Sequence, residues 1–151
     1  MSLKKAFGTN KQSIEEGVWV ELCENEDGTT CRLRIKRMGQ QTPEFMKQIA
    51  NHRKAFSADH FSAAKIDQQQ ASMIRVIAKT IIVGWENVED WRVSEETDSF
   101  PGSETSRPKY MEYTSENAEI MLIEFPDLLE LITEQATDLE TFQDKDIEIK
   151  N

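Results

Sequence analysis

The chain has 151 residues, of which 38% are hydrophobic and 30% charged, and its formal net charge is −10. This length is sufficient for one domain with a hydrophobic core, and the apolar content excludes a chain that is disordered throughout. The longest apolar run, residues 81–85, is far too short to cross a bilayer, and no apolar stretch follows the basic start of the chain as a secretory signal requires. We therefore expect no membrane partner.

The charge is divided unevenly along the chain. Residues 1–83 contain 13 Lys and Arg against 9 Asp and Glu, a net charge of +4, whereas residues 84–151 contain 5 against 19, a net charge of −14. An acidic half of this kind argues against nucleic acid as a partner. It indicates either a solvated surface or a basic protein partner.

The chain begins with an arm and a β-hairpin. Residues 1–16 show no apolar periodicity, so we expect a flexible arm there. From 18 to 37, apolar and polar residues alternate on both sides of Asp27-Gly28, which is a strong signal for a hairpin turn. A two-residue turn at this site places Leu22 opposite Leu33 on an apolar face. The polar face then carries Trp19, Glu21, Arg32 and Arg34.

This register places the two cysteines on opposite faces of the hairpin. Cys23 lies on the polar face opposite Arg32, and Cys31 lies on the apolar face opposite Glu24. Because such side chains cannot form a disulfide, we expect two free thiols that stay apart, as is usual in a reducing cytosol. Their spacing is not that of a zinc site, and both histidines lie far along the chain, so we expect no bound metal.

Four amphipathic helices follow the hairpin, because apolar residues recur at helical spacing in four stretches. These stretches are 43–57, 63–83, 115–125 and 127–142. Residues 94–108 lack periodicity and predict a long mobile loop, and residues 144–151 predict a frayed tail. The expected fold is α+β, mainly α, with an N-terminal β-hairpin and about four helices in a single domain over residues 17–143.

No group of catalytic residues is recognisable in the sequence. It contains no glycine-rich phosphate loop, no nucleophile-elbow motif and no metal-binding helix motif. His52 falls on the apolar stripe of the helix at 43–57, a position typical of a packed histidine, and His60 has no visible partner. We therefore expect a protein without catalytic residues or a cofactor, which works by binding other proteins.

The two C-terminal helices carry more apolar residues than one buried stripe requires. Either the surplus is buried within the monomer, or part of it faces a partner with acidic residues as a polar rim. No Lys or Arg occurs between Lys109 and Lys145 to neutralise those acids. The residues of this candidate partner surface are Ile120, Ile123, Glu130, Leu131, Glu134, Asp138 and Leu139. A second candidate surface consists of Trp19, Arg32 and Arg34.

Three segments resemble tail assembly chaperones of bacteriophages with long non-contractile tails. Residues 78–88 (AKTIIVGWENV) are similar to the family's helix followed by an apolar-x-Gly-Trp-x-x-Val motif. Residues 113–118 (YTSENA) are similar to the start of the family's next helix, and residues 125–132 (FPDLLELI) to its Pro-Asp-Leu helix. The resemblance covers residues 18–142. It departs from the family at 89–109, where the family has a short Asp/Gly turn.

The resemblance implies a non-enzymatic protein of the host cytoplasm that acts during tail assembly and is absent from the finished virion. It would keep the tape measure protein soluble and help to recruit tail tube subunits, and self-association is expected. One alternative is a structural protein retained in the virion, such as a head–tail completion or tail terminator protein. Another is a small host-directed regulator that binds a basic protein.

Overall fold

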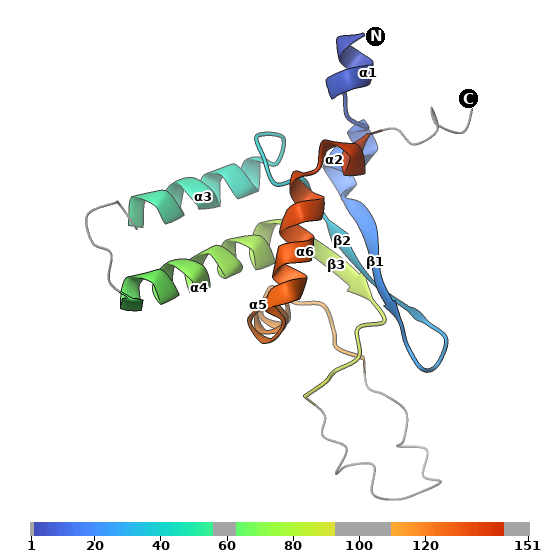
Figure 1. The fold of residues 1–151 in the computed structure, drawn as a ribbon, viewed down its shortest axis with the longest axis vertical. Helices are drawn as coiled ribbons and strands as arrows, with labels where there is room; N and C mark the ends of the chain where they lie inside the picture. Colours follow the sequence, from blue (N-terminus) through green and yellow to red (C-terminus); the bar gives the residue numbers. More distant parts are fainter. Residues whose placement is uncertain (1, 56–62, 93–109, 144–151) are drawn as a thin grey trace, which may run out of the picture.

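The computed structural model describes residues 2–55, 63–92 and 110–143 (Figure 1). The fold is α+β and mainly helical, which confirms the predicted class. Its antiparallel sheet has the strand order β1-β2-β3. The strands are β1 (Val18–Glu24), β2 (Thr30–Ile35) and β3 (Ile82–Glu86). The helices are α1 (Leu3–Phe7), α2 (Lys11–Glu16), α3 (Pro43–Ala55), α4 (Ala63–Thr80), α5 (Ser115–Glu124), α6 (Pro126–Thr137) and the 3₁₀ helix η3 (Leu139–Phe142).

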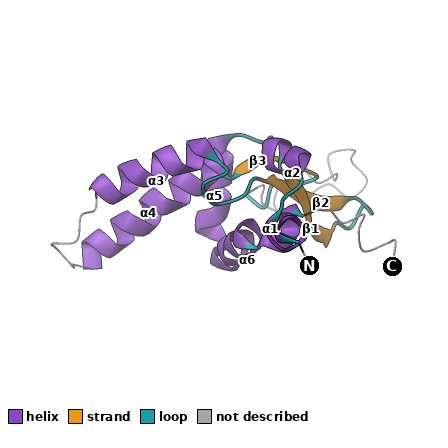
Figure 2. Ribbon diagram, turned by 90° about the horizontal axis from the view of Figure 1, so that it is seen from above, coloured by secondary structure: helices purple, strands orange, loops and turns teal. Residues whose placement is uncertain are grey.

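Helices and sheet share one core. Helices α3 and α4 lie side by side and project away from the sheet, as two views at right angles show (Figure 1 and Figure 2). The central strand β2 alternates buried and half-buried residues, so one face of it is fully covered. The buried residues of that face belong to one hydrophobic cluster with residues of α3, of the C-terminal part of α4, of α5 and of α6. The core includes Leu33, Ile35, Ile77, Ile81, Ile82, Ala118, Leu122 and Ile132.

The sequence does not predict the third strand, because residues 63–83 predict a single helix that ends at Gly84. Helix α4 ends at Thr80, and the chain continues directly into β3. Gly84 lies inside this strand, opposite Arg34 of β2. The run Ile81–Val83 is β-branched and favours a strand once β2 offers an open edge for pairing.

The hairpin forms, but its predicted register is wrong. Val20, rather than Leu22, lies opposite Leu33. The turn contains three residues instead of two: Asn25 pairs with Thr29 across it, and Gly28 adopts a left-handed φ of 88°. A three-residue loop of this kind uses glycine at its left-handed position. Gly28 is therefore the last residue of a three-residue loop, whereas the sequence predicted it as the second residue of a two-residue turn.

A β-bulge between Glu21 and Cys23 shifts the register again near the turn. As a result Cys23 lies directly opposite Cys31. The prediction that the two thiols lie on opposite faces is therefore wrong, although both are free cysteines in the structure. The cause is the extra residue in β1, because a bulge adds one residue to one strand and reverses the alternation beyond it.

The N-terminal segment of the described fold is hydrogen-bonded to its C-terminal segment. The segment expected as a loose arm contains α1 and α2, and the side chain of Asn10 caps α2 by accepting from Ser13 N at 3.0 Å. The backbone N–H of Asn10 also donates to the carbonyl of Phe142 at 2.7 Å. Short helices with side-chain caps lack the apolar repeat on which a sequence-based prediction depends.

The predicted C-terminal helix at 127–142 is two elements. Helix α6 ends at Thr137, and η3 follows after Asp138, whose side chain accepts from Glu140 N at 3.0 Å. Asp138 therefore caps η3. The predicted loop 94–108, the predicted tail 144–151 and residues 56–57 of the first predicted helix lie outside the described residues.

Within the described parts of the chain, no helix is both long enough and apolar enough to span a membrane.

The buried face of β2 predicts the largest losses of stability. Leu33 is 0% exposed at the centre of the sheet, so Leu33→Ala is expected to lower the free energy of unfolding by about 2–5 kcal/mol. Ile123→Ala is the control, because Ile123 is exposed, and it should change that free energy by less than about 0.5 kcal/mol. Urea unfolding followed by circular dichroism measures both. Equal losses would show that Leu33 does not lie in the core.

Candidate protein-binding surfaces

Helix α5 is apolar on two sides and buries only one of them. Ala118, Met121 and Leu122 are buried against the core. Ile120 and Ile123 lie on the other side and are 39% and 58% exposed. Burial within the monomer, one of the two readings of the sequence, therefore does not account for these two side chains.

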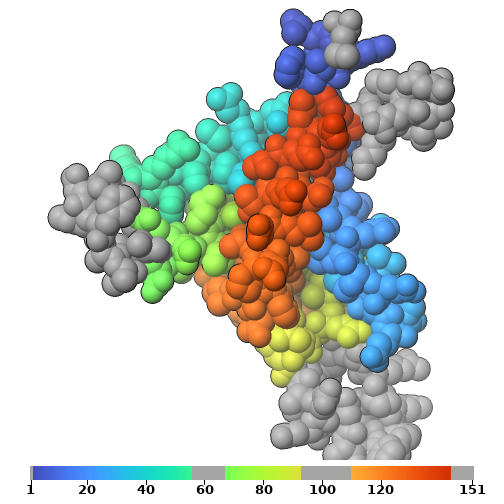
Figure 3. Space-filling model, viewed as in Figure 1, coloured from blue at the N-terminus to red at the C-terminus, as the bar shows by residue number. Residues whose placement is uncertain are grey.

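Helix α6 also has an exposed apolar residue, and acidic residues lie next to it. Leu131 is 36% exposed, and Glu130 and Glu134 beside it on the helix are exposed. We call Ile120, Ile123, Glu130, Leu131 and Glu134 the acidic α5–α6 surface. The space-filling view shows α6 lying across one face of the molecule (Figure 3).

Two further residues of the candidate partner surface predicted from the sequence do not lie on this exposed part of α5 and α6. Leu139 is half-buried, and Asp138 is the cap of η3, so neither belongs to the acidic α5–α6 surface as defined here. Conversely, Phe125 is 40% exposed between the two helices and packs edge-on against Trp91, with ring centroids 4.8 Å apart. The sequence contained no signal for this ring contact.

No described basic residue neutralises the acids of this surface. The one salt bridge from another helix to α5 or α6 in the described structure joins Arg75 of α4 to Glu119, with the closest N and O atoms 3.5 Å apart. Neither Glu130 nor Glu134 forms a salt bridge among the described residues. The surface therefore presents negative charge to any protein that approaches it.

Aromatic residues hold the start of α5 against the sheet. Trp85 of β3 donates from its indole nitrogen to the carbonyl of Met111 at 2.8 Å. Tyr113 donates to the carbonyl of Ile82 at 2.7 Å, and its ring meets that of Trp85 edge to face, with centroids 5.1 Å apart. Burial raises the pKa of the Tyr113 hydroxyl. Trp85 and Tyr113 come from two of the segments that resemble tail assembly chaperones, and the fold brings them into contact.

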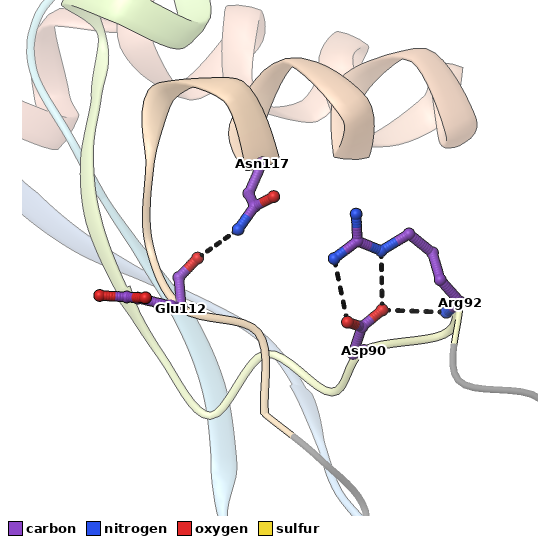
Figure 4. A network of polar contacts seen from close by, with 4 residues as sticks. All are labelled: Asp90, Arg92, Glu112 and Asn117. Atoms are coloured by element: carbon purple, nitrogen blue, oxygen red, sulfur yellow. Dashed lines mark hydrogen bonds and ion pairs between the residues drawn. The ribbon is translucent and has the colours of Figure 1, made fainter. Parts of the chain in front are cut away.

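Polar contacts fix the same region. The hydroxyl of Thr114 caps α5 by accepting from Asn117 N at 3.0 Å. The side chain of Asn117 donates to the carbonyl of Glu112 at 2.9 Å, and Arg92 donates twice to the carboxylate of Asp90 at 2.9 and 3.0 Å (Figure 4). The bonds of Thr114 and Asn117 order the start of α5, and the bonds of Arg92 to Asp90 order the segment after β3. The contacts of Trp85 and Tyr113 are the ones that join the start of α5 to the sheet.

The second candidate surface lies on the outer face of the sheet. Trp19 is 37% exposed, and the guanidinium carbons of Arg32 and Arg34 lie 4.5 and 5.8 Å from its ring centroid. Arg32 forms a salt bridge to Glu86 at 2.7 Å, and Arg34 lies 3.7 Å from Glu16. The structure thus brings all three predicted residues together, but their positive charges already have acidic partners in the fold.

A pocket between α3 and α4 has a volume of about 190 Å³ and is lined by both polar and apolar groups, with Ser72 and Val76 among its residues. His52 is half-buried there, and its Nδ1 lies 2.9 Å from the hydroxyl of Ser72. The position agrees with the prediction of a packed histidine. In the described residues no group of three or more His, Cys, Asp or Glu side chains is arranged to hold a metal ion.

The hairpin tip is tied to the strand-like segment that precedes α5. The Tyr110 hydroxyl donates to the Asp27 carboxylate and lies 3.2 Å from the hydroxyl of Thr29. Thr29 in turn donates to Asp27 from its backbone N–H at 3.0 Å and from its hydroxyl at 2.6 Å. These bonds lower the pKa of Asp27, with the Thr29 hydroxyl as the largest cause and Tyr110 as the second.

The contact between Asp27 and Tyr110 predicts a change in acid titration. In Tyr110→Phe the pKa of Asp27 should rise, yet stay below its ordinary value, because Thr29 still donates to it. A lowered pKa in the folded state stabilises the fold above the ordinary pKa, and this contribution is lost as the pH falls through the lowered value. Carboxyl carbon NMR titration measures the shift, and an unchanged Asp27 pKa would contradict this contact.

Comparison with known proteins places most of the chain in one family. A family described as the YdaY prophage protein matches residues 35–150, from the end of β2 through all the helices that follow. No curated protein and no solved structure matches the chain. The matched range includes the acidic α5–α6 surface and excludes β1 with most of β2. Because the match covers well over half of its length, the chain belongs to the YdaY prophage protein family and is of phage origin.

Proposed function

We propose that this protein is a tail assembly chaperone that binds the tape measure protein and helps to recruit tail tube subunits without catalysing a reaction. The observation that carries this proposal is the exposure of Ile120, Ile123 and Leu131 on an acidic surface. Phage origin supports the general setting, and the resemblance of three segments to tail assembly chaperones supports the specific role.

Apolar burial on this surface supports reversible binding. Complete burial of one aliphatic side chain contributes about 1.5–3 kcal/mol, and these three begin partly covered. Association costs several kcal/mol in lost freedom of motion, so three such side chains support a weak to moderate complex. This range suits a chaperone, which must hold its client and then release it to the growing tail.

Charge on the same surface favours selectivity. Glu130 and Glu134 lie beside Leu131 and are exposed to solvent. Charges at the rim of an interface mainly change the association rate and the choice of partner, and salt weakens their effect. We therefore infer a client whose contacting helix combines apolar residues with Lys or Arg.

The proposed function implies specific binding partners and a place of action in the cell. The tape measure protein is the client, the tail tube protein is recruited, and further copies of the chain associate with it. The protein acts in the host cytoplasm and is absent from the mature virion. Its presence in purified virions, detected by mass spectrometry, would favour a head–tail completion or tail terminator protein instead.

Removing apolar area from the surface should abolish client binding while the fold is retained. The double change Ile120→Ser with Ile123→Ser is expected to leave tape measure protein from the same prophage insoluble on co-expression, because the buried area of the complex is lost. The matched control is Leu3→Ser with Phe7→Ser, since both residues are exposed apolar residues of α1. Circular dichroism verifies folding. If the client stays as soluble with the Ile120→Ser, Ile123→Ser variant as with the wild type, this surface is not the client-binding site.

Reversing the charge of the surface tests its acidic part separately. Glu130→Lys with Glu134→Lys should slow association with the client at low salt, and the difference from wild type should shrink as salt is raised. Asp138 is left unchanged because it caps η3. The control, Glu26→Lys with Asp67→Lys, makes the same change of charge at two exposed acids elsewhere. If both pairs slow association equally, only the net charge of the protein matters.

A further inference from the structure

We propose that Cys23 and Cys31 form a cross-strand dithiol on the hairpin, a modification site that a small external disulfide oxidises to an intramolecular disulfide. The two residues are direct partners in the β1–β2 register. Both are free cysteines in the structure. This pairing is independent of the acidic α5–α6 surface and does not depend on the function proposed above.

The register satisfies the distance requirement of a disulfide. Directly opposed residues in an antiparallel pair have Cα atoms about 4.5 or 5.5 Å apart, depending on the kind of pair. Disulfides span Cα distances of about 4.4–6.8 Å, so either kind of pair is suitable. The bulge between Glu21 and Cys23 is essential, because without it the alternation of β1 would place the two thiols on opposite faces.

The two thiols differ in access to solvent, which sets the order of reaction. Cys23 is exposed on β1, an edge strand, whereas Cys31 is buried on the central strand. Burial, with smaller contributions from the neighbouring Cys23 and Glu89, raises the pKa of Cys31 to about 12. A small disulfide therefore meets the Cys23 thiol first, and Cys31 reacts second from within the sheet.

The reaction is two successive thiol–disulfide exchanges. The Cys23 thiolate attacks one sulfur of a low-molecular-mass disulfide, whose S–S bond breaks and releases one thiolate. Cys31 then loses its proton and attacks the Cys23 sulfur of the mixed disulfide, which releases the second thiolate. In total, two protein thiols are oxidised to one disulfide, and the external disulfide is reduced to two thiols that take up the two protons.

The bond would join the edge strand to the central strand beside the bulge. β2 carries buried core residues such as Leu33, whereas β1 pairs with the sheet along one side only. A covalent link at this point restrains opening of β1, so the oxidised protein should exchange the backbone amides of β1 more slowly than the reduced protein.

Incubation of the full chain with oxidised glutathione at pH 8.5, followed by alkylation and intact mass spectrometry, tests the proposal. The wild type should lose the mass of two hydrogen atoms, protect both cysteines from alkylation and slow amide exchange in β1 at least several-fold. In Cys31→Ala and in Cys31→Val, which keeps apolar volume at the buried site, Cys23 should instead retain glutathione. In Cys23→Ser the folded protein should remain unmodified.

Three results would overturn the proposal. They are a lasting glutathione adduct on Cys23 of the wild type, a disulfide between two chains, and no reaction in the folded chain under conditions that oxidise the urea-unfolded chain. Circular dichroism of each variant verifies folding, and the comparison of the two Cys31 variants separates a loss of packing from the loss of the thiol.

Discussion

The pairing of β3 with β2 is the constraint on which the rest of the structure depends. It joins residues about fifty positions apart in the chain and places Trp85 opposite Leu33. The backbone continues the pairing at its end, where Lys36 N donates to the carbonyl of Ile81 at 2.8 Å. Because β3 follows α4 directly, this pairing also determines where α4 ends and which of its residues face the core.

From that strand, a chain of contacts leads to the acidic α5–α6 surface. Trp85 and Ile82 of β3 bind the segment before α5 through Met111 and Tyr113. The helix then buries one apolar side and leaves Ile120 and other residues of the opposite side exposed. An exposed aliphatic residue on a rigid helix is prearranged for contact, so little conformational entropy is lost when a partner binds it.

The outer face of the sheet carries charged and aromatic residues that contact one another. There Trp19 and Arg32 contact each other, and Glu86 neutralises the arginine. Cation–π contacts and exposed salt bridges each contribute on the order of 1 kcal/mol or less, so this cluster mainly orders the surface. The acidic α5–α6 surface has no such internal compensation in the described residues, and we consider it the stronger candidate for binding.

The sequence by itself determined the mainly helical α+β class, the hairpin and the approximate positions of α3, α4, α5 and α6, because helical periodicity and the Asp27-Gly28 signal are local. It also identified Ile120 and Leu131 as part of a surplus of apolar residues, since the two C-terminal helices carry more of them than one buried stripe requires. Local pattern was sufficient there because amphipathicity is a property of a single helix.

Only the tertiary structure decided the end of α4, the register of the hairpin and the exposure of the surplus residues. Residues 81–83 suit both a helix and a strand, and the open edge of β2 selects the strand. The β1 bulge, which brings Cys23 opposite Cys31, depends on how β1 meets a strand already packed on the core. Exposure of Ile123 likewise depends on what other helices cover, a global property that no local repeat encodes.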